Sequence, residues 1–176
     1  MKKLLFLIAS LTIVLAACSS DKEEAKETTT NGATSSEEKA NPAADMMNFY
    51  LSISKAINEV DADLNTFENA KAEETLPEGA ELQTMKDAAK VAADNSAAKV
   101  EELEVPAELK DYQKDIDAAL AKMKEAYTMK SEALAAEGEV QLDEANAKFE
   151  EADTELNAVL EKTGLIGSSI YNEVSL

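Results

Sequence analysis

The chain has 176 residues and a formal net charge of −19, because 36 Asp and Glu residues stand against 17 basic residues. It contains no histidine, no arginine, no tryptophan and only one cysteine. Ser-His-Asp and Cys-His catalysis require a histidine base, zinc and di-iron sites require His or Cys ligands, and nucleic-acid binding requires a basic surface. We therefore expect no enzyme activity, no metal or other cofactor and no nucleic-acid partner.

The N-terminus has the parts of an export signal. Lys2 and Lys3 precede an apolar run of about a dozen residues, which is shorter than the roughly twenty needed to cross a membrane. The run ends in Leu15-Ala16-Ala17-Cys18, and Cys18 is the single cysteine. This motif resembles the lipobox of bacterial lipoproteins that type II signal peptidase processes. The resemblance implies a diacylglyceryl group on the Cys18 sulfur and cleavage between Ala17 and Cys18, which removes a signal peptide of residues 1–17.

A lipid on Cys18 would hold the mature protein at the extracytoplasmic face of the cell membrane. One acyl chain such as palmitate binds a membrane only marginally, whereas two give stable anchoring. The alternatives are an ordinary secretory signal with a chance cysteine, or an uncleaved N-terminal anchor. The lipidated cysteine and the polar residues after it, 18–41, lack large apolar side chains and are predicted to form a disordered tether.

The folded part is predicted to begin at Asn41-Pro42, which is typical of a helix N-cap followed by the first helical residue. Apolar residues then recur at 4-3 spacing, which predicts a first helix over residues 42–71 that packs as in a coiled coil. Thr75-Leu76-Pro77-Glu78 has the form of a capping box and predicts the start of a second helix. The first stripe consists of Met46, Tyr50, Ile53, Ile57, Val60, Leu64 and Phe67.

The second and third helices are predicted over residues 77–104 and 106–137. Val105-Pro106 separates them, because the residue before a proline is disfavoured in a helix. Lys130 interrupts the third stripe, and Gly138 is the expected left-handed cap at its end. The second stripe consists of Leu82, Met85, Ala89, Ala92, Ser96, Val100 and Leu103, and the third of Leu109, Ile116, Leu120, Met123, Tyr127 and Leu134.

The fourth helix is predicted over residues 139–163 and ends in Lys162-Thr163-Gly164. The apolar C-terminal tail, 165–176, is expected to fold back over the core, with a partner-binding or membrane-touching segment as the alternative. The short connections predict an all-α fold, an antiparallel up-down four-helix bundle. The alternative is one long helix through Gly138. The fourth stripe consists of Leu142, Ala145, Phe149, Ala152, Leu156 and Val159.

Two short motifs resemble helical surface lipoproteins of Gram-positive bacteria. One is Glu137-Gly138-Glu139-Val140, followed by Ala145 and Phe149, and the other is Val105-Pro106-Ala107-Glu108-Leu109. The resemblance implies a helical extracytoplasmic domain and no catalytic residues.

In an up-down bundle, the first and third turns meet at the end away from the tether, where acidic residues would gather. This acidic patch is either a solvated surface or a docking site for a cationic protein or peptide, with loosely held divalent ions as a further alternative. Its predicted members are Glu68, Glu73, Glu74, Glu78, Glu81, Glu132, Glu137, Glu139, Asp143 and Glu144.

These features predict a membrane-anchored lipoprotein with a non-enzymatic binding or adaptor domain. The alternative is a structural or protective envelope lipoprotein whose acidic domain sequesters cationic peptides or basic enzymes. The regular stripes would also suit an intermolecular coiled coil, so the oligomeric state stays open.

Overall fold

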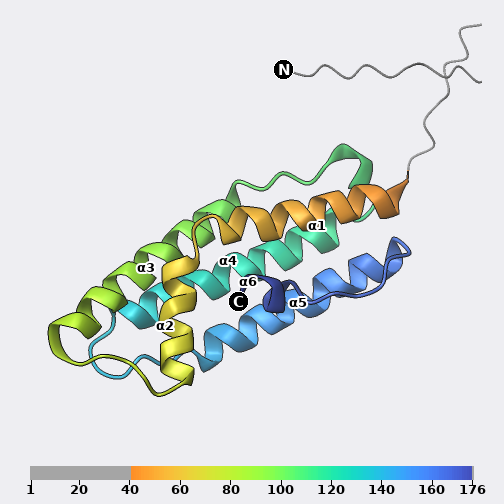
Figure 1. Cartoon of the computed structure of the whole chain (residues 1–176). Helices are drawn as coiled ribbons and strands as arrows, with labels where there is room; N and C mark the ends of the chain where they lie inside the picture. The colour runs from red at the N-terminus through yellow and green to blue at the C-terminus, as the bar shows by residue number, and fades with distance from the viewer. Residues whose placement is uncertain (1–40, 176) are drawn as a thin grey trace, which may run out of the picture. The chain divides into compact units, whose positions relative to one another are not determined.

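Helices form all the regular secondary structure of the residues that the structure describes. The computed structural model describes residues 41–175, which belong to one unit, Glu38–Leu176. The all-α prediction is therefore confirmed for this part of the chain. In order, the helices are α1 (Pro42–Asn58), α2 (Ala62–Ala72), α3 (Gly79–Glu101), the 3-10 turn η1 (Ala107–Leu109), α4 (Gln113–Ala135), α5 (Asp143–Lys162) and α6 (Ile170–Val174) (Figure 1).

The predicted first helix is in fact two helices. Asn41 caps α1 as expected, because its Oδ1 accepts a hydrogen bond from the backbone N–H of Ala44 at 3.3 Å. The chain then leaves the helical path between Asn58 and Ala62, and α2 points in a new direction (Figure 1). No glycine or proline marks this break. The apolar spacing runs through it because both helices bury the same stripe.

The predicted capping box at the start of the second helix is wrong. Glu78 is the N-cap of α3, the helix begins at Gly79, and no side chain caps it. Thr75 instead belongs to the end of α2, where its backbone N–H donates to the Ala70 carbonyl at 2.8 Å. Glu74 there has φ = 58° and takes the left-handed position that usually requires glycine.

The third predicted helix begins later than Pro106. The 3-10 turn η1 comes first, and α4 starts at Gln113. Gly138, with φ = +92°, then separates α4 from α5, so the alternative of one long helix is wrong. An L-residue with a Cβ disfavours this backbone conformation, and a helix cannot continue through it.

The end of α5 follows the expected glycine pattern. Gly164 has φ = +89°, its N–H donates to the Glu161 carbonyl, and the N–H of Leu165 donates to the Leu160 carbonyl. This pair of bonds is a Schellman motif, which satisfies carbonyls that the helix itself leaves free. The chain then turns back, and part of the predicted tail forms α6.

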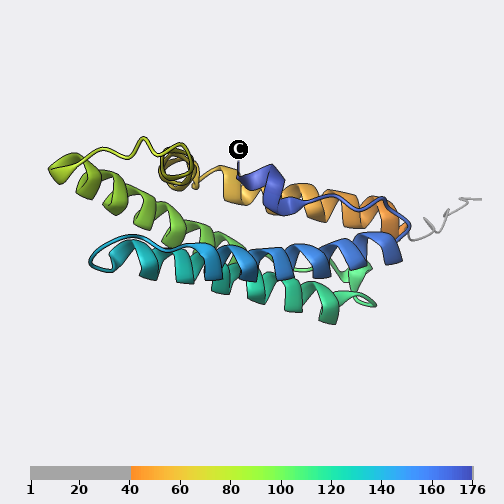
Figure 2. The ribbon, with the colours of Figure 1, turned by 90° about the horizontal axis from the view of Figure 1, so that it is seen from below.

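The helix α4 packs against α3 and α5, which both run in the opposite direction (Figure 1). The helix α1 lies over α3, also antiparallel to it. Figure 2 shows α2 end-on while the long helices are seen from the side, so α2 crosses them. The helix α6 fills the space between α1 and α5.

The predicted stripes form one core. Most of their members are buried, among them Ile53, Phe67, Ile116, Met123 and Phe149. Ile170 and Val174 of α6 join the same core, so the C-terminal tail folds back over it. Val60, Leu82, Met85 and Leu103 are only partly buried.

Candidate functional site

The turn between α2 and α3 and the turn between α4 and α5 lie at the same end of the domain (Figure 1). Two shallow pockets join them, and residues of both turns line each pocket: Leu76 and Lys71 with Glu139 in one, Gly79 with Glu137 in the other. Most of the predicted acidic patch is exposed on or beside these turns, namely Glu73, Glu74, Glu78, Glu81, Glu137 and Glu139.

Helix termini explain part of this charge. Glu81 lies in the first turn of α3, and Asp143 and Glu144 lie in the first turn of α5. A carboxylate in this position interacts favourably with the positive end of the helix dipole. Local helix stability is therefore one physical reason for acidic residues here.

Two lysines reduce the negative charge of the same end. Lys71 Nζ lies 3.7 Å from Glu139 Oε1. Lys86 is buried, and its Nζ donates to the Ala136 carbonyl at 3.0 Å, which caps the C-terminus of α4. The contact of Lys86 with Ala136 was not expected, because Lys86 lies far in sequence from the turn between α4 and α5.

A second group of patch residues lines a groove of about 540 Å³ between α4 and α5. Glu132, Asp143 and Glu144 surround it, with Met129 and Ala133 among the apolar lining. None of the three carboxylates forms an ion pair with another residue of 41–175. The negative charge of the acidic patch is therefore exposed and not neutralised by lysines along the groove between α4 and α5.

Glu68 lies apart from the rest of the predicted patch. Its side chain is only 16% exposed, and its Oε1 lies 2.7 Å from Nζ of Lys130, which is 3% exposed. Among the described residues that oxygen has no donor in hydrogen-bond geometry, so the contact is an ion pair between closely placed charges. The break in the expected third stripe at Lys130 was the sequence signal for this contact.

Aromatic rings surround the Lys130 ammonium. Its Nζ lies 5.9 Å from the ring centre of Tyr127, 6.0 Å from that of Phe149 and 5.8 Å from that of Tyr171. The negative ring faces attract a cation, and the attraction is stronger where water is excluded. These rings come from α4, α5 and α6, so Lys130 links three helices to Glu68 of α2.

Asp61, at the break between α1 and α2, adds a second buried carboxylate to this cluster. It is 3% exposed, and its Oδ2 has no hydrogen-bond partner within residues 41–175. Burial raises the pKa of Asp61 above its usual value, and the nearby charge of Glu68 adds to the increase, whereas a hydrogen bond with Asn65 and the charge of Lys130 oppose it. Burial also raises the pKa of Tyr127. Sequence reasoning missed Asp61 because it lies between two apolar stripe positions.

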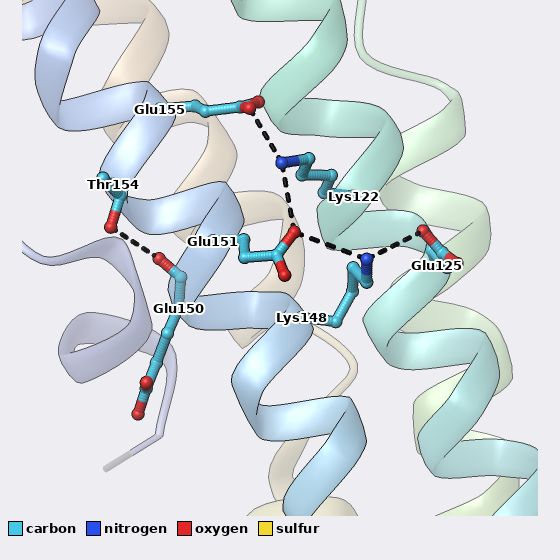
Figure 3. Close-up of polar contacts among 7 residues, drawn as sticks. All are labelled: Lys122, Glu125, Lys148, Glu150, Glu151, Thr154 and Glu155. Atoms are coloured by element: carbon cyan, nitrogen blue, oxygen red, sulfur yellow. Dashed lines mark hydrogen bonds and ion pairs between the residues drawn. The ribbon is translucent and has the colours of Figure 1, made fainter.

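Surface lysines connect the helices in pairs. Figure 3 shows Lys122 between Glu151 and Glu155, and Lys148 between Glu151 and Glu125. Lys122 Nζ lies 3.1 Å from Glu151 and 2.8 Å from Glu155, while Lys148 Nζ lies 3.4 Å from Glu151 and 3.8 Å from Glu125. The hydrogen bond with Lys122 and then that with Lys148 lower the pKa of Glu151. Exposed pairs of this kind stabilise a fold little, but they engage Lys122 and Lys148 within the domain.

Cys18 and the expected cleavage between Ala17 and Cys18 lie outside the described residues. Within residues 41–175, no helix is both long enough and apolar enough to span a membrane, and no three Asp or Glu side chains are arranged to hold a metal ion. Comparisons of the chain with protein-family models, with curated proteins and with solved structures find no match.

Proposed function

We propose that this protein is a lipoprotein, anchored through Cys18 at the extracytoplasmic face of the cell membrane, whose helical domain binds a cationic protein or peptide without catalysis. One observation carries the binding proposal: most of the domain's own lysines are engaged within the chain, while the acidic patch stays largely unpaired. The lysines that form ion pairs are Lys71, Lys90, Lys99, Lys122, Lys124, Lys130, Lys148 and Lys162.

The anchoring proposal rests on the sequence from Lys2 to Cys18 and on the composition of the tether. We also infer an antiparallel up-down four-helix bundle whose first helix is broken into α1 and α2. The alternating directions of α1, α3, α4 and α5 support this arrangement (Figure 1). The acidic turns would then lie at the end opposite Pro42, where the tether joins the domain, and would face away from the membrane.

The anchor is tested by Cys18→Ser in bacterial cells that express the full chain. We expect the unaltered chain to fractionate with membranes and to incorporate an alkyne-labelled fatty acid, and the variant to lose both properties. Ser20→Ala, beside the expected site, serves as the control and should retain both. A Cys18→Ser chain that keeps the label or the membrane association would refute lipidation at this residue.

The binding proposal is tested with the chain from Ser19 onward and with poly-lysine as the probe. Glu73→Gln/Glu78→Gln/Glu137→Gln should weaken binding at low salt more than a matched triple variant on the opposite part of the surface. That control is Glu108→Gln/Asp111→Asn/Asp117→Asn, whose exposed carboxylates form no ion pair with other described residues. If the two variants lose the same amount of affinity, poly-lysine binding depends only on the net charge of the chain, and the acidic patch is not a docking site.

The exposed carboxylates also favour a protective role, in which the domain sequesters cationic peptides or basic enzymes at the envelope. Deletion of the gene should then sensitise cells to cationic antimicrobial peptides, and expression of the triple patch variant should restore less resistance than expression of the unaltered chain. If the deletion strain is as sensitive to cationic antimicrobial peptides as the parent strain, the protective role is excluded, while the binding role is unaffected.

A further inference from the structure

A shallow groove of about 400 Å³ lies between α2 and α3. We call it the α2–α3 groove, and its lining consists of Asp63, Thr66, Pro77, Glu81, Thr84, Met85 and Ala88. The threonine hydroxyls are turned back onto their own helices, since Thr66 donates to the Ala62 carbonyl at 2.8 Å and Thr84 to the Ala80 carbonyl at 3.0 Å. The methyl groups of Thr66 and Thr84 therefore remain for the groove surface, beside Pro77, Met85 and Ala88, so the lining is mostly apolar.

Two carboxylates, one from each helix, belong to the lining of this largely apolar groove. Asp63 comes from α2 and Glu81 from α3, and both are exposed. Neither forms an ion pair with another residue of 41–175. A groove with this combination complements an aliphatic side chain that ends in a cation, because lysine buries its methylene groups along apolar surface and keeps its ammonium outside.

The apolar surface extends along α3 beyond the groove. Val91 follows Thr84 and Ala88 at helical i, i+4, i+7 spacing, so the three side chains share one face of α3. Val91 is 57% exposed, although its β-branched side chain is apolar. An occupant of the α2–α3 groove can therefore place a second apolar side chain over Val91, about one helical turn away.

We propose that the α2–α3 groove docks a short amphipathic basic peptide or helix, with one lysine or arginine stem along the groove lining and an apolar residue on Val91. This inference rests on the proposed cationic partner and makes it more specific, because it requires apolar as well as basic groups. The remaining acidic patch, including the α4–α5 groove, steers the partner through its field without setting its position.

The test uses fluorescent peptides of equal length and charge and the chain from Ser19 onward. One peptide carries leucines at helical spacing among its lysines, and in the other serines replace the leucines. Binding is measured by fluorescence anisotropy at about 0.02 M and about 0.3 M NaCl, since the Debye length falls severalfold over this range. We expect the leucine peptide to bind at least tenfold more tightly, and to keep part of its affinity at high salt because apolar burial is not screened.

Two variants locate the site. Asp63→Asn/Glu81→Gln should weaken the leucine peptide about three- to tenfold at low salt, as expected for the loss of two exposed ion pairs. The control is Asp45→Asn/Glu108→Gln, which removes the same charge from the first turns of α1 and η1 and should change affinity by less than about twofold. Val91→Ser should lower the preference for the leucine peptide over the serine peptide.

The outcomes separate the two levels of the proposal. If neither peptide binds at low salt, the cationic partner itself is refuted. If both bind equally, or if the Asp63/Glu81 and control variants behave alike, binding by net charge remains and the α2–α3 groove is refuted. A loss confined to Asp143→Asn/Glu144→Gln would also refute it, because the position of docking would then be the α4–α5 groove.

Discussion

The Lys130–Glu68 pair places two charges where little water reaches them, and substitution of either partner should be strongly destabilising. At 2.7 Å and an effective dielectric constant of about 20, the attraction between the two charges is about 6 kcal/mol before the cost of desolvation. That cost offsets most of the attraction, but removal of one partner leaves the other charge buried without compensation. Such a change typically lowers the free energy of unfolding by about 3–5 kcal/mol.

The two single variants should differ. Glu68→Gln leaves the Lys130 ammonium, which is 3% exposed, with Asp61 as the remaining carboxyl group nearby, so we expect a loss of about 2–4 kcal/mol. Lys130→Met leaves both Glu68 and Asp61 without their cation, and Asp61 cannot reach water. We expect the larger loss here, about 3–5 kcal/mol.

A double variant tests the reasoning. Lys130→Met/Glu68→Leu replaces the pair by apolar groups of similar length and should recover at least half of the loss, since well-packed apolar residues often substitute for a buried ion pair without cost. The measurement is urea denaturation of the chain from Ser19 onward at neutral pH. Single variants within about 1 kcal/mol of the unaltered chain, or a double variant as unstable as the sum of the singles, would refute the buried pair.

Three further predictions follow from the described contacts. Because burial raises the pKa of Asp61, the carboxyl group binds a proton more readily in the folded state than in the unfolded state. The unaltered chain should therefore gain stability relative to Asp61→Asn as the pH falls from neutral toward about 4. Urea titrations at several pH values measure this difference, and a loss of stability instead would contradict the burial of Asp61. Glu74→Gly should raise the free energy of unfolding by about 1 kcal/mol because it relieves the left-handed backbone at φ = 58°, whereas Glu73→Gly, in a helical conformation, should lower it. Removal of residues 170–176 uncovers the core over Ile170 and Val174 and should cost about 3–6 kcal/mol by the same urea assay; an unchanged midpoint would mean that α6 does not pack as described.

Helix identity was largely predictable because it depends on local spacing. The stripes over α4 and α5 are buried throughout, since a residue that recurs every three or four positions must face one side of a helix. The stripe over α3 is buried in its middle, while Leu82, Met85 and Leu103 are only partly buried. Gly164 ended α5 as expected, because it occupies a backbone conformation that other residues disfavour. Gly138 has the expected left-handed conformation, but α4 ends before it, at Ala135, with Ala136 as an extended C-cap. Most of the acidic patch also gathers at one end, which follows from short connections between antiparallel helices.

The errors occurred where the backbone depends on distant residues. The 4-3 stripe of the first helix is the same for one straight helix and for two helices that bury the same side, so the break at Asp61 left no periodic signal. The predicted capping box failed because Thr75 is used to close α2 before α3 begins. Glu68 counted as a surface residue from its position near the turn, although its Oε1 lies 2.7 Å from Nζ of Lys130 on α4.

The sequence by itself therefore determined the helical class, the stripes that form the core, the glycine end of α5 and the excess of negative charge, since each depends on residue type and local spacing. It also contains the Leu15-Ala16-Ala17-Cys18 motif on which the anchoring proposal rests. Only the tertiary structure decided the angle between α1 and α2, the position of α6 and the environment of Lys130. Those features depend on side chains from α2, α4, α5 and α6 that contact the buried ammonium of Lys130. These residues are far apart in sequence, so local spacing does not predict which of them come together.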